Sequence, residues 1–335
     1  MVQLAKDGDA YVIVRAGSAP IASWGNDPDL RRIHTAEAIR ECLHSYGTDT
    51  RLAVCGLRGS GVVVRDFEFP ALPAEEIKAA VMLEASQICP FGLEDSSLDY
   101  QVTSSGEKTT SGFWVAATNV LMRTTRRLIH DAGLRCTLLD VDGLAMLNCL
   151  EGSSRTEAPV PEEAANHPPA TGKPALLDVG DLWTTVSIVG ANGRPFVRDI
   201  ALGAEEILRR LSDEMGVPQE PLLAALGGAP EDLDPHALEH SFERACLDLI
   251  DDVVATLRYY GAQKGAAKVE TMLVSGPLAT TERFIELLGA RLAVDVQPWN
   301  PLAAMPCEAD EQCEAVVRKE GASMAVATGL AMRSI

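Results

Sequence analysis

The chain has 335 residues, a formal net charge of −19 and eight cysteines. This length allows two or more domains, each with its own core. The negative charge argues against nucleic acid and anionic lipid as direct partners, because both are polyanions. The cysteines are scattered without a CxxC pair, which fits a reducing compartment. No stretch approaches the ~20 apolar residues of a membrane-spanning helix, and the first residues do not resemble a signal peptide, so we expect no direct membrane insertion.

The first part of the chain predicts strands followed by a helix. Apolar runs at 2–5 and 11–14 flank an Asp-Gly pair, which is typical of a β-hairpin. Further strands are expected at 51–54 and 61–64, and Pro73 then opens a helix at its first turn. The other elements expected before residue 150 are strands at 98–102 and 113–117 and a helix at 121–132, which Gly133 ends.

The amino-acid composition changes at residues 151–174, which are rich in Pro, Ser, Glu and Ala and contain almost no large apolar residue. Such a segment cannot form a core, and we expect a mobile linker. The elements expected after it are a hairpin at 176–189, a strand at 195–200, a helix at 204–215, a long helix from Pro235 with an apolar core stripe, a strand at 272–274, a short helix, an edge strand at 294–296 and a final helix at 324–332. The order indicates two similar halves that face one cleft.

The turn within LLDVGDLWTT, residues 176–185, is the most informative local feature. Asp178 could hold the hydrated Mg²⁺ that accompanies a nucleotide, and Gly180 would let backbone amides approach a phosphate. Thr184 and Thr185 would add two hydroxyls at the tip of the turn. The alternative is an ordinary β-turn, in which Asp and Gly are favoured in any case.

A series of motifs, in this order along the chain, resembles the PilM family, the actin-like cytoplasmic proteins of type IV pilus assembly. The motifs are FPALPAEEI at 69–77, Pro90-Phe91, LDYQ at 98–101, AATN at 116–119, LDVD at 139–142, LLDVGDLWTT at 176–185, FVRDI at 196–200 with Gly203, LRYY at 257–260, Asn300-Pro301 and GLA at 329–331. They run from about residue 2 to residue 333, so the resemblance covers nearly the whole chain.

The resemblance implies an α/β, actin-like (ribonuclease H-like) fold of two lobes, related to the cell-division protein FtsA, with a small αβ subdomain inserted in lobe one. The boundaries expected by analogy are 1–65, 135–150 and 322–335 for the core of lobe one, 66–134 for the inserted subdomain, 151–174 for the linker and 175–321 for lobe two, with a long helical part at about 204–265.

The resemblance also implies a function as an assembly scaffold. PilM-like proteins grip the short tail of the membrane protein PilN in a groove beside the inserted subdomain, here residues 66–134. Peptide capture of this kind needs an apolar groove with free backbone edges rather than a catalytic constellation. We therefore expect a cytoplasmic protein that is peripheral at the inner membrane through its partner and that contacts other pilus assembly proteins. The residues of the groove cannot be assigned from the sequence.

A nucleotide in the cleft of an actin-like protein is ATP with Mg²⁺. The residues that could bind it here, with Asp178 holding Mg²⁺ through water, are Asp178, Gly180, Thr184, Thr185, Gly203, Ser275 and Gly276. Other elements depart from the family. Asp7-Gly8 cannot be the first phosphate turn, since residues 2–4 match the second strand, and the chain begins just after the expected place of that loop. Pro277 alters the adenine loop by removing an amide donor, and residues 220–226 lack the usual Lys.

Two explanations of these departures stay open: a start codon assigned too late, or a nucleotide site that has decayed. The second favours a scaffold with weak or lost ATP binding and no useful turnover. The alternatives are an ATP-gated clamp, the cytoplasmic component of type II secretion, which normally continues into a membrane helix, and a small-molecule kinase of the same superfold. Fold similarity alone does not separate them.

Overall fold

The computed structural model describes residues 1–8, 10–25, 27–48, 50–153, 174–190, 193–228, 233–263 and 265–333. Its strands are β1 (Val2–Asp7), β2 (Ala10–Ala16), β3 (Leu52–Leu57), β4 (Val62–Pro70), β5 (Ser96–Ser105), β6 (Thr109–Thr118), β7 (Arg135–Val141), β8 (Ala175–Val179), β9 (Thr184–Val189), β10 (Pro195–Ile200), β11 (Thr271–Ser275) and β12 (Asp295–Pro298). Its helices are α1 (Pro28–Ser45), α2 (Ala74–Ile88), α3 (Asn119–Asp131), α4 (Asp142–Ser153), α5 (Ala204–Met215), α6 (Gln219–Leu226), α7 (Pro235–Gly261), α8 (Glu282–Leu292), α9 (Glu311–Glu320) and α10 (Ala325–Ala331), with 3-10 turns at Leu93–Asp95 and Gly321–Met324.

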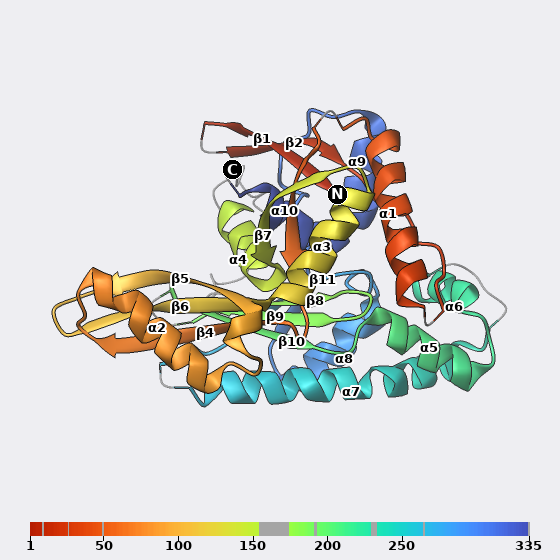
Figure 1. Ribbon diagram of the computed structural model, residues 1–335. Coiled ribbons are helices and arrows are strands. Elements are labelled where there is room, and N and C mark those ends of the chain that lie inside the picture. The colour runs from red at the N-terminus through yellow and green to blue at the C-terminus, as the bar shows by residue number, and fades with distance from the viewer. Residues whose placement is uncertain are drawn as a thin grey trace.

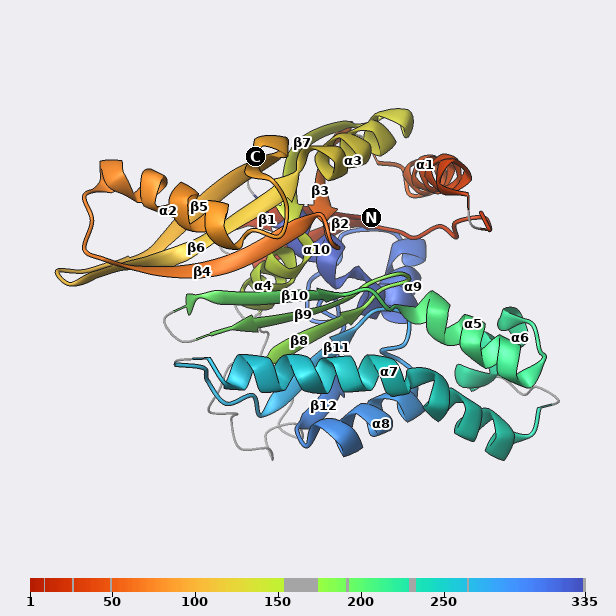
Figure 2. The same cartoon turned by 60° about the horizontal axis from the view of Figure 1, so that its bottom comes forward.

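A five-stranded sheet in the order β10-β9-β8-β11-β12, with helices α5 to α8, forms what we call lobe two. The central strand β8 is antiparallel to β9 and parallel to β11. Every residue of β8 and β9 is buried, and Figure 2 shows α7 running along one face of the sheet. The hairpin predicted around Asp178 and the edge strand predicted near residue 295 are both confirmed.

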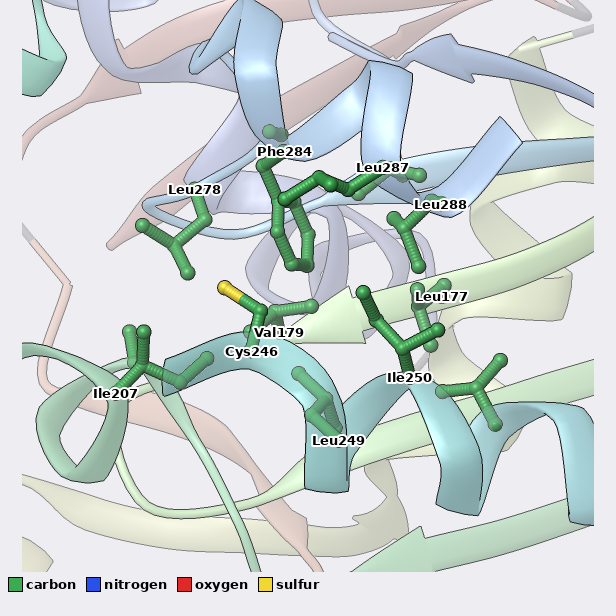
Figure 3. Close-up of a cluster of buried hydrophobic side chains, with 14 of the residues drawn as sticks. Leu177, Val179, Ile207, Cys246, Leu249, Ile250, Leu278, Phe284, Leu287 and Leu288 are labelled. Carbon is green, nitrogen blue, oxygen red and sulfur yellow. The ribbon is translucent and has the colours of Figure 1, made fainter. Parts of the chain in front are cut away.

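The main hydrophobic core fills the space between this sheet and helices α5, α7 and α8 (Figure 3). Cys246, Leu249 and Ile250 of α7 face Leu177 and Val179 of β8. All five side chains are almost completely buried. The apolar stripe predicted along the helix that Pro235 opens is therefore a core face, as expected.

Lobe one, as we use the term, comprises strands β1, β2, β3 and β7 with helices α1, α3, α4 and α10, and lies above lobe two in the view of Figure 1. β1 and β2 form an antiparallel hairpin, and Gly8 in its turn has a φ of +61°, so the predicted Asp-Gly hairpin is confirmed. β3 and β7 form a separate parallel pair. Helices α4 and α10 pack against each other beside β3.

The remaining strands form a three-stranded antiparallel sheet in the order β4-β6-β5, and helix α2 packs on it. Trp114 and Val81 are fully buried between the sheet and the helix. Figure 1 shows this unit projecting from one end of the molecule. β5 is paired on one side only, so its other edge is free of strand partners among the described residues.

The sequence interpretation did not include helices α1, α4 and α9. Helix α1 has a recognisable start, because the Asp27 carboxylate accepts hydrogen bonds from two amides of the first turn and Pro28 occupies the first helical position. Its buried face consists mainly of small residues, among them Ala36, Ala38 and Cys42. These give little apolar periodicity for a sequence pattern to detect.

The expected domain boundaries stay a prediction. Most of the expected linker, residues 154–173, lies outside the described residues. Helix α3, which the sequence assigned to the inserted subdomain, contacts α1, β3 and β7 as well as β6.

Candidate functional site

Two of the predicted cleft residues meet at the carboxyl ends of β8 and β11. The Ser275 hydroxyl donates a hydrogen bond of 2.8 Å to Asp178 Oδ1, and both residues are buried. Gly276 follows with a φ of +99°, and a Cβ atom there would overlap the carbonyl oxygen of Val179. The close approach of the two strand ends therefore accounts for the Ser-Gly pair without any adenine ring.

An arginine that the sequence did not single out lies between the two lobes. Arg58 follows β3, and its Nε atom is 3.4 Å from Asp142 Oδ2 in lobe one. Its Nη1 atom is 3.6 Å from Asp178 Oδ2 in lobe two. The same guanidinium covers the predicted turn, because a Cβ atom at Gly180 would be 2.6 Å from Nη1. Arg58 thus links carboxylates of both lobes.

The residue after Arg58 makes a second link between the lobes. The backbone amide of Gly59 donates a hydrogen bond of 2.6 Å to Asp199 Oδ2, and the Thr185 hydroxyl donates to Oδ1 of the same carboxylate at 2.7 Å. The Trp183 ring packs over Gly59, where a Cβ atom would be 3.0 Å from it. The Gly59 amide, which could otherwise face an anion, is therefore already bonded to a carboxylate.

The two predicted hydroxyls do not lie at the tip of the turn, which corrects the sequence interpretation. Thr184 and Thr185 belong to β9 and are fully buried. The Thr184 hydroxyl donates to the Leu202 carbonyl at 2.7 Å. Both hydroxyls therefore connect β9 to its surroundings within lobe two.

The first amides of helix α5 are bonded to the same turn. Ala204 N donates to Gly180 O and Glu205 N to Asp181 O, each at 2.9 Å. Gly203 is required at this contact, because a Cβ atom there would lie against the carbonyl of Asp181. Free amides at a helix N-terminus bind phosphate, and these two have carbonyl partners instead.

Burial dominates the electrostatics of the cleft. It raises the pKa of Asp142 to about 7, although Arg58 opposes the shift and Asp178, Asp199 and Asp140 add to it. Burial also raises the pKa of Asp178 against the opposing effects of Arg58 and of the Ser275 hydroxyl. The pKa of Asp199 is raised by burial too, against its hydrogen bond from the Gly59 amide. The carboxylates here therefore outnumber the Arg58 guanidinium that contacts two of them.

The raised pKa of Asp142 predicts a pH-dependent stability. Because the folded-state pKa of about 7 exceeds the ordinary value of 3.8, the folded chain binds this proton more tightly than the unfolded chain. The stabilisation is complete below pH ~4 and is lost as the pH rises through ~7, by about 4 kcal/mol. We expect Asp142→Asn to flatten the fall in the free energy of unfolding between pH 5.5 and 8, measured by urea denaturation. An unchanged slope in the variant would contradict the assignment.

The residues present do not fit ATP with Mg²⁺. Arg58 is the ion-pair partner of Asp178, the expected Mg²⁺ carboxylate, and lies against Gly180 of the phosphate turn. The two hydroxyls that the sequence predicted to face phosphate, those of Thr184 and Thr185, are bonded within the protein. The neighbouring amides of Gly59 and Ala204 are bonded within the protein as well. A nucleotide would have to displace these contacts.

A second candidate site is a cavity of about 560 Å³ beside the three-stranded sheet. One wall is β5, whose consecutive residues 97–101 line the cavity. The cavity is also lined by residues 138–141 of β7 and by Leu144, Leu147 and Asn148 of α4. A volume of this size is typical of a ligand site. The sequence predicted a groove beside residues 66–134 without naming its residues.

Two polar groups, one on β7 and one on α4, line this cavity. Arg333 Nε is 2.9 Å from Asp140 Oδ2, and burial raises the pKa of Asp140 while Arg333 opposes the shift. Asn148 Nδ2 is buried and has no hydrogen-bond partner among the residues that the structure describes. A buried amide donor without a partner costs free energy.

Sequence reasoning missed the cleft residues Arg58, Asp142 and Asp199, although a signal was present. Arg58 directly follows β3 and Asp142 directly follows β7. The two strands are parallel neighbours, so their carboxyl ends meet at one edge of lobe one. A prediction that β3 and β7 pair would therefore have placed Arg58 and Asp142 at the cleft.

No helix in the described ranges has the length and apolar character needed to cross a membrane.

A solved structure shares the fold of this chain, and two others resemble it more weakly. The structure described as "PilM-PilN type IV pilus biogenesis complex" is 21% identical, with 99% of this chain and 94% of that chain covered and a TM-score of 0.73. The ethanolamine utilization protein EutJ from Carboxydothermus hydrogenoformans is 14% identical over 63% of this chain and 60% of that chain, with a TM-score of 0.39. The cytoplasmic domain of EpsL from Vibrio cholerae is 11% identical over 85% and 79%, also with a TM-score of 0.39. The first match shows that the fold is the two-lobed, actin-like α/β fold expected from the motifs.

Family comparison agrees with the motifs. The sequence profile described as "Type IV pilus assembly protein PilM" matches residues 1–335, the whole chain. This chain therefore belongs to the PilM family of type IV pilus assembly proteins.

Proposed function

We propose that this protein is a cytoplasmic scaffold of type IV pilus assembly that grips the tail of a PilN-like membrane protein in the cavity between β5 and β7. The observation that carries the proposal is that one cavity is bordered by two strand edges that have no strand partner among the described residues. The similarity of the fold to a protein solved as a PilM-PilN complex supports the choice of partner. Through this partner the protein would be peripheral at the inner membrane and would meet the other pilus assembly proteins.

The lining of the cavity indicates how a tail would bind. Side chains of a strand alternate between its two faces, yet the consecutive residues 97–101 of β5 and 138–141 of β7 line the same space. The backbone edges of both strands must therefore border the cavity. Each strand is the last of its sheet among the described residues, so its outward amides and carbonyls can pair with an extended segment.

The chemistry of the cavity indicates the kind of tail that fits. Apolar side chains line it, including Leu57, Leu139 and Leu147. Three acidic residues, Asp99, Asp140 and Glu151, line it against one arginine, Arg333, which pairs with Asp140. The chain as a whole has a net charge of −19. An extended apolar segment with basic rather than acidic neighbours matches these features.

The interlobe cleft supports a scaffold that does not depend on ATP. Arg58 and the carboxylates of both lobes form contacts where a nucleotide would have to enter. We infer that ATP binding is weak or lost and that the protein has no useful turnover, as a pseudo-ATPase would.

The proposed function is tested with a fluorescent peptide that carries the N-terminal cytoplasmic tail of the PilN-like partner. We expect saturable binding by fluorescence anisotropy to the full chain, and no binding of a peptide with the same composition in scrambled order. We also expect Asp178→Ala, folded as judged by circular dichroism, to bind the tail as the unaltered chain does. Equal binding of tail and scrambled peptide would contradict the proposal.

A further inference from the structure

Positive charge is concentrated in one region of this acidic chain. The chain has 48 acidic and 29 basic residues, yet residues 119–135 contain four arginines and a single acidic residue, Asp131. The Asp131 carboxylate is already paired with Arg32 of α1. Charges at a protein surface are screened beyond about 8 Å at physiological salt. The local charge, rather than the net charge of −19, therefore decides what can bind here.

The exposed face of helix α3 carries most of this charge. Arg123, Arg127 and His130 recur at intervals of three or four residues and are all exposed, so they share one side of the helix. Arg126 is exposed beside them. None of the three α3 arginines forms an ion pair with a carboxylate in the ranges that the structure describes. Like charges four residues apart destabilise a helix, so an anion from outside the chain would relieve this face.

The starts of β3 and β7 extend the same surface. The Arg135 amide donates a hydrogen bond of 2.8 Å to the Arg51 carbonyl, so these two exposed arginines come from neighbouring backbones. Arg51, Arg40 and His44 line a cavity of about 400 Å³. Neither Arg40 nor Arg51 is ion-paired within the described part of the chain. Guanidinium groups bind phosphate oxygens in pairs, so a phosphate is the ligand that this cavity suits.

Exposed apolar side chains beside these arginines indicate which kind of polyanion fits. Val120 is 65% exposed at the start of α3, and Leu52, next to Arg51, is 47% exposed. Surfaces that combine basic and exposed apolar side chains bind membranes, because the basic groups meet anionic headgroups and the apolar groups reach the acyl boundary. A nucleic acid would use the arginines but would leave the apolar side chains in water.

The same helix borders the cavity of the proposed function. Met122 of α3 lines the space in which we place the tail of the membrane partner, and Figure 2 shows α3 on the side of lobe one that faces away from lobe two. A protein held by such a tail would have α3 close to the lipid.

We propose that this region contacts the anionic phospholipid headgroups of the membrane from which the tail emerges. Its arginines, which we call the cationic face, are Arg40, Arg51, Arg123, Arg126, Arg127 and Arg135. The identity of the membrane rests on the proposed function, whereas the binding of anionic lipid does not require the tail.

The test is flotation of the full chain, without tail peptide, with vesicles of phosphatidylethanolamine and phosphatidylglycerol or with vesicles of phosphatidylcholine alone. We expect binding to the anionic vesicles only, and weaker binding as the NaCl concentration rises. Arg123→Gln/Arg127→Gln should lower the partition coefficient by about 30-fold, since each arginine at an anionic surface contributes about fivefold.

The matched control is Arg258→Gln/Arg291→Gln. It removes two exposed arginines of lobe two that are also without ion pairs among the described residues, and it changes the net charge equally. We expect this variant to bind vesicles as the unaltered chain does. Arg123→Gln/Arg127→Gln should keep full affinity for the tail peptide in the anisotropy titration, so lipid binding and tail binding are judged separately.

Three outcomes would overturn the proposal. The first is absence of the chain from anionic vesicles, whatever its affinity for the tail. The second is an equal loss of vesicle binding in the two double variants, which would indicate an effect of net charge rather than of the cationic face. The third is self-association in sedimentation velocity that Arg123→Gln/Arg127→Gln abolishes while anionic vesicles stay unbound, which would assign the face to a second copy of the chain.

Discussion

Asn148→Phe should weaken binding of the partner's tail by about 30-fold or more, a loss of about 2 kcal/mol typical of a central contact. Asn148 lies on α4 at the wall of the 560 Å³ cavity, so a phenyl ring there would take up space that an extended segment needs. The change also removes the buried amide donor that has no partner among the described residues. The measurement is the anisotropy titration with the tail peptide.

The matched control is Gln87→Phe. Gln87 is an exposed residue of α2 that does not line the cavity, so the same ring there should leave the affinity unchanged. Both variants should keep the Tm of the unaltered chain within a few degrees. Unchanged tail affinity in Asn148→Phe would place the binding site elsewhere.

Gly276→Ala should destabilise lobe two by about 3 kcal/mol or more, among the larger effects expected of one substitution. Its φ of +99° is unfavourable for any residue with a Cβ atom, and that atom would overlap the carbonyl of Val179. The strand ends of β8 and β11 would have to separate. Urea denaturation followed by circular dichroism measures the effect.

Gly133→Ala isolates the backbone part of this effect. Gly133 has a φ of +83°, but a Cβ atom there would meet nothing within 4 Å. We expect a loss of about 1 kcal/mol, from the backbone conformation alone. If both variants lose the same free energy of unfolding, the close approach at Gly276 does not contribute to stability. The Ser-Gly pair would then need another explanation, such as a ligand.

The sequence was sufficient for elements that carry local signals. Asp-Gly between apolar runs predicted the β1–β2 hairpin, and Gly216 with Pro218 beyond it marked the end of α5, where Gly216 adopts a φ of +66°. These signals lie within a few residues of one another, so no tertiary information is needed. Family motifs supplied the two-lobed fold, which the comparison with the PilM-PilN structure bears out.

The interlobe cleft was less predictable because its contacts join distant parts of the chain. Arg58, Asp142 and Asp178 are far apart in sequence, and only the pairing of β3 with β7 and the packing of the lobes brings them together. A Gly or Thr in a turn looks the same in a sequence whether it faces a phosphate or a neighbouring strand. In the structure Gly276 faces Val179 and Thr184 bonds to Leu202.

The central claim is that the chain grips its partner's tail without help from nucleotide. The most direct measurement is isothermal titration of the tail peptide into the full chain, once in EDTA and once in several millimolar Mg-ATP. The account predicts the same affinity and a stoichiometry of one in both titrations. Binding that is detectable only with Mg-ATP would contradict it, since the cleft would then act as a nucleotide-gated clamp despite Arg58.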